Sequence, residues 1–217
     1  MNNKIIFDLD GTLIDSKNEI LDTYFKVFNL IKPTKKNFKI EDINFSSSLN
    51  AILADLFEND QTLISKAKFL FTEIYDSSNF ERTNLYDDVF NCLEDFFNCG
   101  YDLYIATNKR ISPTRKILEA KNILHFFKEV ITLDSIENKT LSKTEMVKYL
   151  CIRNQIKSGF MVGDSSGDII AGKEANLDQI AVLYGYEEKT FLVGKKPTFV
   201  VNNFKEIQSI IKNYGKY

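Results

Sequence analysis

Apolar residues recur at helical spacing between positions 16 and 83, a stretch with no glycine and a single proline, Pro33. Spacings of three and four residues predict three amphipathic helices. Their apolar positions are Ile20, Leu21, Tyr24, Phe25 and Phe28, then Leu49, Ile52, Leu53 and Leu56, then Leu63, Ala67, Leu70, Phe71 and Ile74. Aromatic residues at this spacing usually pack in a core. Residues 16–83 are therefore predicted to form a small helical bundle.

The pattern is different in the rest of the chain, where short apolar runs alternate with helical segments. The runs predict strands over 5–7, 103–106, 130–133, 160–162, 180–184 and 199–201, with a last helix over 204–211. This alternation predicts an α/β fold with a doubly wound, mostly parallel sheet. Residues 1–15 and 84–217 would form this core domain, and residues 16–83 would be inserted into it.

Local signals mark several helix ends. Gly100 is suited to the position after a helix C-terminus, and Asn176 to a left-handed residue in the same role. Ser112-Pro113 predicts an N-cap followed by the first helical residue. Ser142-Lys143-Thr144-Glu145 matches a capping box, which predicts that a helix opens there.

Composition narrows the class of protein. The chain has 217 residues, 44% of them hydrophobic and 27% charged, which is ordinary for a globular protein. Its formal charge of −2 gives no electrostatic basis for binding nucleic acid or an anionic membrane. The three cysteines have no metal-binding spacing, and no leader or membrane span is apparent. We expect a cytoplasmic protein, a monomer or a homodimer.

Two aspartates follow the first predicted strand directly, in Asp8-Leu9-Asp10-Gly11-Thr12. The carboxyl edge of a parallel sheet is where α/β proteins bind ligands, and alternation along the strand would point both carboxylates to one side. Paired carboxylates need a positive partner, such as a divalent metal. An EF-hand is excluded because Leu13 stands where such a loop needs glycine. Asp-x-Asp also occurs in metal-dependent glycosyltransferases.

Other predicted strands end in polar residues too. Thr107 and Asn108 follow the strand over 103–106, and Asp164 and Asp168 follow the strand over 160–162. Hard carboxylate oxygens suit Mg²⁺, which binds one or two carboxylates together with phosphate oxygens. Lys143 falls in the first turn of a predicted helix, where the helix dipole favours anions.

These motifs, in this order, resemble those of the haloacid dehalogenase (HAD) superfamily over almost the whole chain. The resemblance implies that Asp8 is a nucleophile and Asp10 a general acid and base. It implies the following further roles: phosphate binding by Asp8, Gly11, Thr107, Asn108 and Lys143; catalysis also by Thr107 and Lys143; and Mg²⁺ binding by Asp8, Asp10, Asp164 and Asp168. Lys139 is the rival to Lys143 for the family's lysine.

The resemblance extends to residues 16–83, which stand where this family has a C1 helical cap. Residues 181–186 resemble the phosphoglycolate phosphatase-like branch, although Lys143-Thr144 replaces a common Lys-Pro pair and Asn176 replaces a usual glycine. The implied activity is Mg²⁺-dependent hydrolysis of a small phosphorylated metabolite. A β-phosphoglucomutase-like mutase and a non-catalytic regulatory protein remain alternatives. His125 is expected to be structural, and residues 46–48 to be a linker or a substrate loop.

Overall fold

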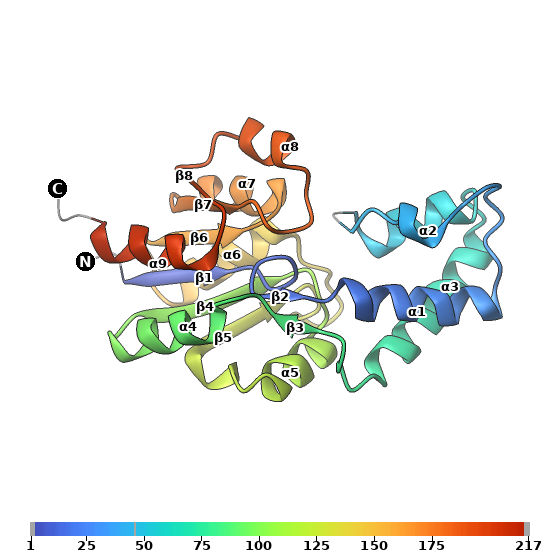
Figure 1. Cartoon of the computed structure of the whole chain (residues 1–217), viewed down its shortest axis with the longest axis horizontal. Helices are drawn as coiled ribbons and strands as arrows, with labels where there is room; N and C mark the ends of the chain where they lie inside the picture. The colour runs from blue at the N-terminus through green and yellow to red at the C-terminus, as the bar shows by residue number, and fades with distance from the viewer. Residues whose placement is uncertain (1–2, 46, 215–217) are drawn as a thin grey trace. The chain divides into compact units, whose positions relative to one another are not determined.

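The computed structural model describes residues 3–45 and 47–214, which fall into two compact units (Figure 1). One unit contains the described residues up to Asp15 and those from Asn84 onward. The other unit spans Ser16–Thr83.

A six-stranded sheet forms the centre of the first unit. Its strand order is β5-β4-β1-β6-β7-β8, and every neighbouring pair is parallel. The strands are β1 (Lys4–Phe7), β4 (Asp102–Thr107), β5 (Phe127–Thr132), β6 (Phe160–Gly163), β7 (Asp178–Val182) and β8 (Phe199–Val201). A short antiparallel pair, β2 (Ile14–Asp15) with β3 (Asn84–Leu85), lies outside this sheet. The predicted α/β fold with a mostly parallel sheet is confirmed.

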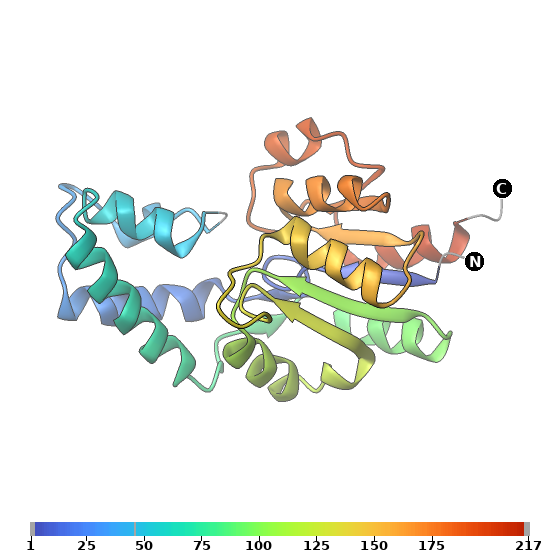
Figure 2. The same ribbon diagram turned by 180° about the vertical axis from the view of Figure 1, so that it is seen from behind.

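Helices cover both faces of the sheet. They are α4 (Val89–Asn98), α5 (Ile111–Ala120), α6 (Lys143–Arg153), α7 (Ser166–Glu174), α8 (Lys189–Gly194) and α9 (Phe204–Asn213), with a 3₁₀ turn η2 at Leu124–Phe126. Helices α6 and α7 pack together on one face, toward the viewer in Figure 2. Helices α4 and α9 pack on the opposite face, toward the viewer in Figure 1. The sheet is therefore doubly wound.

The central strand β1 is apolar on both sides because both of its faces are covered. Ile6 belongs to a buried cluster with Met146 and Leu150 of α6. Its neighbour Phe7 stacks on Phe204 of α9, with ring centroids 5.9 Å apart. A continuous apolar run is typical of a parallel strand buried on both faces. This packing fixes the direction in which the chain leaves the sheet after Phe7.

The second unit contains the three predicted helices, α1 (Lys17–Leu30), α2 (Leu49–Leu56) and α3 (Gln61–Asp76), and a 3₁₀ turn η1 (Ile40–Asp42). Tyr24 is buried in its core, with Phe71 at a ring distance of 4.8 Å. Phe25, predicted to lie on the apolar face of the first helix, is instead 60% exposed. The buried Glu19 carboxylate accepts hydrogen bonds from the Ser78 hydroxyl and from the Arg82 N–H, so it links both ends of this unit's chain.

Some predicted boundaries are wrong. The helix predicted to be capped by Ser112 begins two residues earlier than expected, at Ile111, with Arg110 as its N-cap. The Ile111 N–H donates instead to Asp134 Oδ1 at 2.9 Å, so a distant carboxylate replaces the expected local cap. Strands β5 and β7 also begin earlier than predicted, at Phe127 and Asp178, because residues of the neighbouring strands pair with these positions.

Other local predictions are confirmed. Gly100 and Asn176 follow helix ends with positive φ angles of 78° and 56°. Ser142 and Glu145 form the predicted capping box at the start of α6. Within the described part of the chain, no helix is both long enough and apolar enough to cross a membrane.

Candidate active site

Asp8 directly follows β1, and its backbone N–H still donates to the Val162 carbonyl of β6 at 2.9 Å. The chain then turns sharply, since the N–H groups of Leu13 and Ile14 both donate to the Leu9 carbonyl. This turn ends the strand alternation that was expected to point Asp8 and Asp10 to the same side. Asp8 is buried at the carboxyl edge of the sheet.

Three buried carboxylates meet at this edge. Oxygens of Asp8, Asp164 and Asp168 all lie within 4.8 Å of one another. Asp164 follows β6, and Asp168 lies in the first turn of α7. Two segments far apart in the sequence, the end of β1 and the connection from β6 to α7, therefore bring their acidic side chains to one point.

Lys143 provides the positive charge that faces this acidic group. Its Nζ lies 2.5 Å from Asp8 Oδ1 and 2.9 Å from Asp168 Oδ1, and it donates to the Ala106 carbonyl at 2.8 Å. The capping box of α6 places Lys143 in the first helical turn. Lys139, the rival lysine, is exposed and pairs with Glu145 at 2.7 Å instead.

The electrostatics of the group favour a cation. Three carboxylates and one ammonium leave a formal charge of −2 in a buried place. Burial raises the pKa of Asp8 to about 7, although Lys143 opposes this. Burial, with repulsion from Asp8 and Asp168, also holds the pKa of Asp164 well above its ordinary value. A divalent cation would offset this charge, and hard carboxylate oxygens are the ligands that Mg²⁺ prefers.

The surroundings of Lys143 favour its charged form, whereas those of Asp8 favour the neutral form. Burial would lower the pKa of this ammonium, but the Asp168 and Asp8 carboxylates raise it above its ordinary value. Lys143 is therefore a permanent cation at this edge of the sheet.

Asp168 is oriented from two directions. Its Oδ2 accepts hydrogen bonds from the Ser165 N–H at 3.0 Å and the Ser165 hydroxyl at 2.6 Å, in a second capping box. Its Oδ1 faces Lys143. The same side chain thus caps α7 and belongs to the acidic group.

Asp164 is held by the segment that follows β7 and by the turn that follows β1. The Tyr186 N–H donates to Asp164 Oδ2 at 2.6 Å, and the Thr12 hydroxyl lies 3.4 Å from Oδ1. Two glycines make room for it. A Cβ at Gly185 would lie 2.2 Å from Asp164 Cβ, and one at Gly11, where φ is +80°, would lie 2.1 Å from Oδ2. Neither contact is visible in local sequence spacing.

The loop after β4 carries Thr107, Asn108 and Lys109. The Thr107 hydroxyl is buried and accepts a hydrogen bond from the Lys109 N–H at 3.1 Å, whereas Asn108 is exposed. The Lys109 ammonium lies 3.1 Å from Asp10 Oδ1, and its side chain is only 7% exposed. The sequence patterns did not predict a role for Lys109. Its position directly after Thr107 and Asn108, two predicted site residues, could have suggested one.

Asp10 and Gly11 make contacts other than those expected from the sequence. The acidic group does not include the Asp10 carboxylate, which pairs with Lys109, so its expected part in metal binding is not visible in this geometry. The Gly11 N–H, expected to bind phosphate, donates to the Ile14 carbonyl at 2.8 Å.

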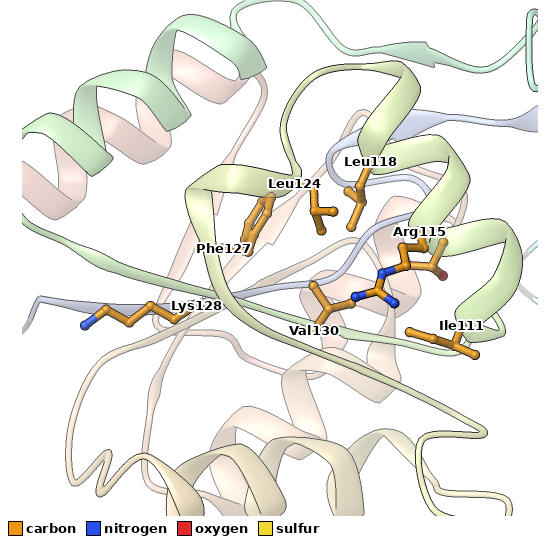
Figure 3. Close-up of a pocket in the computed structure, with 8 residues that line it drawn as sticks. Ile111, Arg115, Leu118, Leu124, Phe127, Lys128 and Val130 are labelled. Atoms are coloured by element: carbon orange, nitrogen blue, oxygen red, sulfur yellow. The ribbon is translucent and has the colours of Figure 1, made fainter.

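A separate hollow of about 300 Å³ lies between α5 and β5 (Figure 3). Leu118, Leu124, Phe127 and Val130 contribute apolar surface, and Arg115 reaches across it. No acidic residue lines it, so it does not extend the acidic group. His125 is exposed nearby in the chain, and Ser46 of the suggested substrate loop lies outside the described residues.

The amino-acid sequence is similar to those of known proteins over most of its length. Residues 5–182 match the profile of the family described as "Haloacid dehalogenase-like hydrolase". A phosphoglycolate phosphatase of Vibrio cholerae is 27% identical over 217 residues, covering 95% of this chain and 96% of that protein. The pyrophosphatase PpaX of Bacillus cereus is 24% identical, covering 99% and 98%.

Solved structures are similar over the whole length. The crystal structure of a putative phosphatase from Clostridium difficile has a TM-score of 0.84 and 27% identity, covering 96% of this chain and 98% of that one. A predicted phosphatase from Clostridium acetobutylicum has a TM-score of 0.85 at 24% identity, covering 98% and 99%, and this likeness bears on the fold alone.

Proposed function

The chain belongs to the haloacid dehalogenase-like hydrolase family as a phosphatase of the phosphoglycolate phosphatase-like kind, and we propose that it hydrolyses a small phosphate monoester with Mg²⁺. The reaction would proceed through an aspartyl-phosphate on Asp8. The observation that carries the proposal is the buried acidic group facing Lys143.

Asp8, Asp164 and Asp168 are the residues that would hold the metal. Their hard oxygen donors and their uncompensated charge fit a divalent cation. When bound, Mg²⁺ supplies positive charge that offsets the charge of the carboxylates and of the substrate phosphate. Asp10 is not needed in this ligand set, since its carboxylate pairs with Lys109.

Asp8 is the proposed nucleophile. One of its carboxylate oxygens attacks phosphorus, the bond from phosphorus to the ester oxygen breaks, and Asp10 gives that oxygen a proton, so an alcohol leaves. In the second half, Asp10 takes a proton from water as the water oxygen attacks phosphorus. The bond between the Asp8 oxygen and phosphorus then breaks, which releases inorganic phosphate and restores the Asp8 carboxylate, while Asp10 again carries the proton that it gives to the next leaving alcohol.

Lys143 and Thr107 would stabilise the charge on the phosphoryl oxygens. Lys143 is a buried permanent cation in contact with Asp8, and the Thr107 hydroxyl proton remains available for donation while its oxygen accepts from Lys109. Preorganised donors of this kind are worth about 10²–10³ in rate each. Asn108, in the same loop as Thr107, would add a donor, whereas the Gly11 N–H, also expected to bind phosphate, donates to the Ile14 carbonyl.

Residues 16–83 are the proposed helical cap domain, and residues 1–15 and 84–217 the proposed core domain. A cap selects the substrate and excludes water while the reaction proceeds. The names of the relatives suggest two substrates to test first, phosphoglycolate and pyrophosphate.

The test is phosphate release with Mg²⁺ from a panel containing phosphoglycolate, sugar phosphates, nucleoside monophosphates, pyrophosphate and p-nitrophenyl phosphate. Asp8→Asn should abolish release while the protein stays folded, and Glu174→Gln, which changes an exposed carboxylate paired with Lys148, should remain active. Asp10→Asn should lose about 10²–10⁴-fold in rate.

Three outcomes would contradict the proposal. Release of phosphate by Asp8→Asn at the wild-type rate would show that Asp8 is not the nucleophile. Transfer of phosphate to another position of a sugar, without inorganic phosphate, would establish a mutase. No turnover of any ester by folded wild type would point to a binding protein.

A further inference from the structure

Lys109 occupies an unusual position for a lysine. Its side chain is 7% exposed, whereas lysine is rarely buried without a partner because an ammonium loses its hydration there. Its Nζ lies 3.1 Å from Oδ1 of Asp10, the carboxyl group that the proposed function uses as acid and base. The sequence patterns assigned no role to this residue.

The loop around Lys109 is fixed on both sides. Before it, the Thr107 hydroxyl accepts the Lys109 N–H at 3.1 Å, a local turn that folds the backbone back toward the sheet edge. After it, Asp134 Oδ1 accepts the Ile111 N–H at 2.9 Å and the Thr132 hydroxyl at 2.7 Å. Lys109 therefore extends from an anchored backbone rather than from a loop held at one end.

Asp10, by contrast, lies in a tight turn beyond the end of β1. Its side chain is 21% exposed, more than the 10% of Asp8. A carboxylate in such a turn can rotate about its terminal bond, which is a broad torsion. An ammonium against one oxygen restricts this rotation and keeps the other oxygen facing a constant direction.

The chemistry of the proposed reaction needs such a restriction. Asp10 must present a proton to the leaving oxygen and later accept one from water, and both steps depend on hydrogen-bond reach. It must also approach a phosphate that carries negative charge, which a neighbouring ammonium makes less unfavourable. Lys143 cannot serve here, because it contacts Asp8 and Asp168.

We infer that Lys109 is a positioning residue that holds the Asp10 carboxyl group for proton transfer to the oxygen of the leaving alcohol and, later, from the attacking water. This inference rests on the proposed function and adds to it. Lys109 contacts one oxygen of Asp10, and the proton moves at the other. Lys109 itself does not bind the phosphate.

The leaving group distinguishes this role from a structural one. An alkyl alcohol leaves poorly as an anion and needs the proton from Asp10, whereas p-nitrophenolate is a stable anion and leaves without it. In the step that releases the leaving group, loss of Lys109 should therefore slow alkyl esters much more than p-nitrophenyl phosphate. Damage to the fold, to metal binding or to phosphate binding would slow both esters alike.

The experiment compares kcat and KM of wild type, Lys109→Met, Lys109→Arg and Lys148→Met with Mg²⁺. The substrates are p-nitrophenyl phosphate and the best alkyl phosphate of the panel. Lys148→Met is the matched control, because Lys148 pairs with Glu174 on the surface, with side chains 47% and 49% exposed. Thermal unfolding of each variant checks the fold.

Lys109→Met should lower kcat/KM about 10²-fold on the alkyl ester, the usual scale for a misplaced catalytic group, with little change in kcat/KM on p-nitrophenyl phosphate. The ratio kcat/KM is the quantity to compare, because it excludes the later hydrolysis of the aspartyl-phosphate, which both esters share. Lys109→Arg should recover most of the loss, and Lys148→Met should match wild type. Equal losses on both esters, or no loss, in a folded variant would overturn the inference alone. An inactive wild type would overturn the proposed function and this inference with it.

Discussion

Removal of the charge on Asp8 should make the metal-free protein more stable at neutral pH. Burial raises the pKa of Asp8 from 3.8 to about 7, and Asp164 shifts in the same direction. The folded protein therefore holds a proton that the unfolded chain releases between about pH 4 and pH 7. By linkage, this contribution to stability is full at low pH and is lost as the pH rises through that window.

The magnitude follows from the size of the shift. A shift of one pKa unit corresponds to about 1.4 kcal/mol, so the full shift of Asp8 is worth about 4 kcal/mol. Between pH 5 and pH 8, about 3 kcal/mol of this is lost. For a chain of 217 residues, 1 kcal/mol moves Tm by about 2–4 °C, so the expected decrease is about 6–12 °C.

The assay is urea and thermal unfolding of wild type and Asp8→Asn in EDTA at pH 5 and pH 8. Wild type should lose about 3 kcal/mol more than Asp8→Asn between the two pH values. Glu174→Gln, at an exposed ion pair, should follow wild type. Adding Mg²⁺ at pH 8 should stabilise wild type more than Asp8→Asn, since ligand binding favours the folded state. Parallel pH profiles of stability for wild type and Asp8→Asn would show that Asp8 does not take up a proton on folding in this pH range.

Two further substitutions test how the site is supported. Gly185→Ala puts a Cβ 2.2 Å from Asp164 Cβ and should weaken Mg²⁺ binding about 10–100-fold in a metal titration. Gly194→Ala, whose Cβ would have nothing within 4 Å, should leave the affinity unchanged, and equal affinities of the two variants would show that Asp164 tolerates the shift. Ser142→Ala removes the N-cap of α6 and should lower the free energy of unfolding, measured in urea, by about 1 kcal/mol. Ser209→Ala, at an exposed hydroxyl, should change this free energy little, and equal losses in the two variants would contradict the importance of the cap.

The fold class could be predicted from the amino-acid sequence, because the spacing of apolar residues and the signals at helix ends are local properties. Apolar runs at the strands and helical spacing in the helices do not depend on distant contacts. The capping box at Ser142 and the left-handed Asn176 are decided within a few residues, and both were predicted. Asp8, Asp164 and Lys143 were also singled out from the sequence, because strand ends and helix starts carry polar groups in an order typical of one family.

Which side chains contact one another could not be predicted in this way, because these contacts form between distant parts of the chain. The Asp134 carboxylate caps a helix that starts 23 residues earlier in the chain, so the Ser112 signal gave the wrong N-terminus. Tyr186 holds Asp164, and Lys109 faces Asp10 across a gap of 99 positions. Such contacts depend on the register of parallel strands and on the turns after them. A pattern read along the chain records which residues are polar, and the folded sheet alone determines which polar residues become partners.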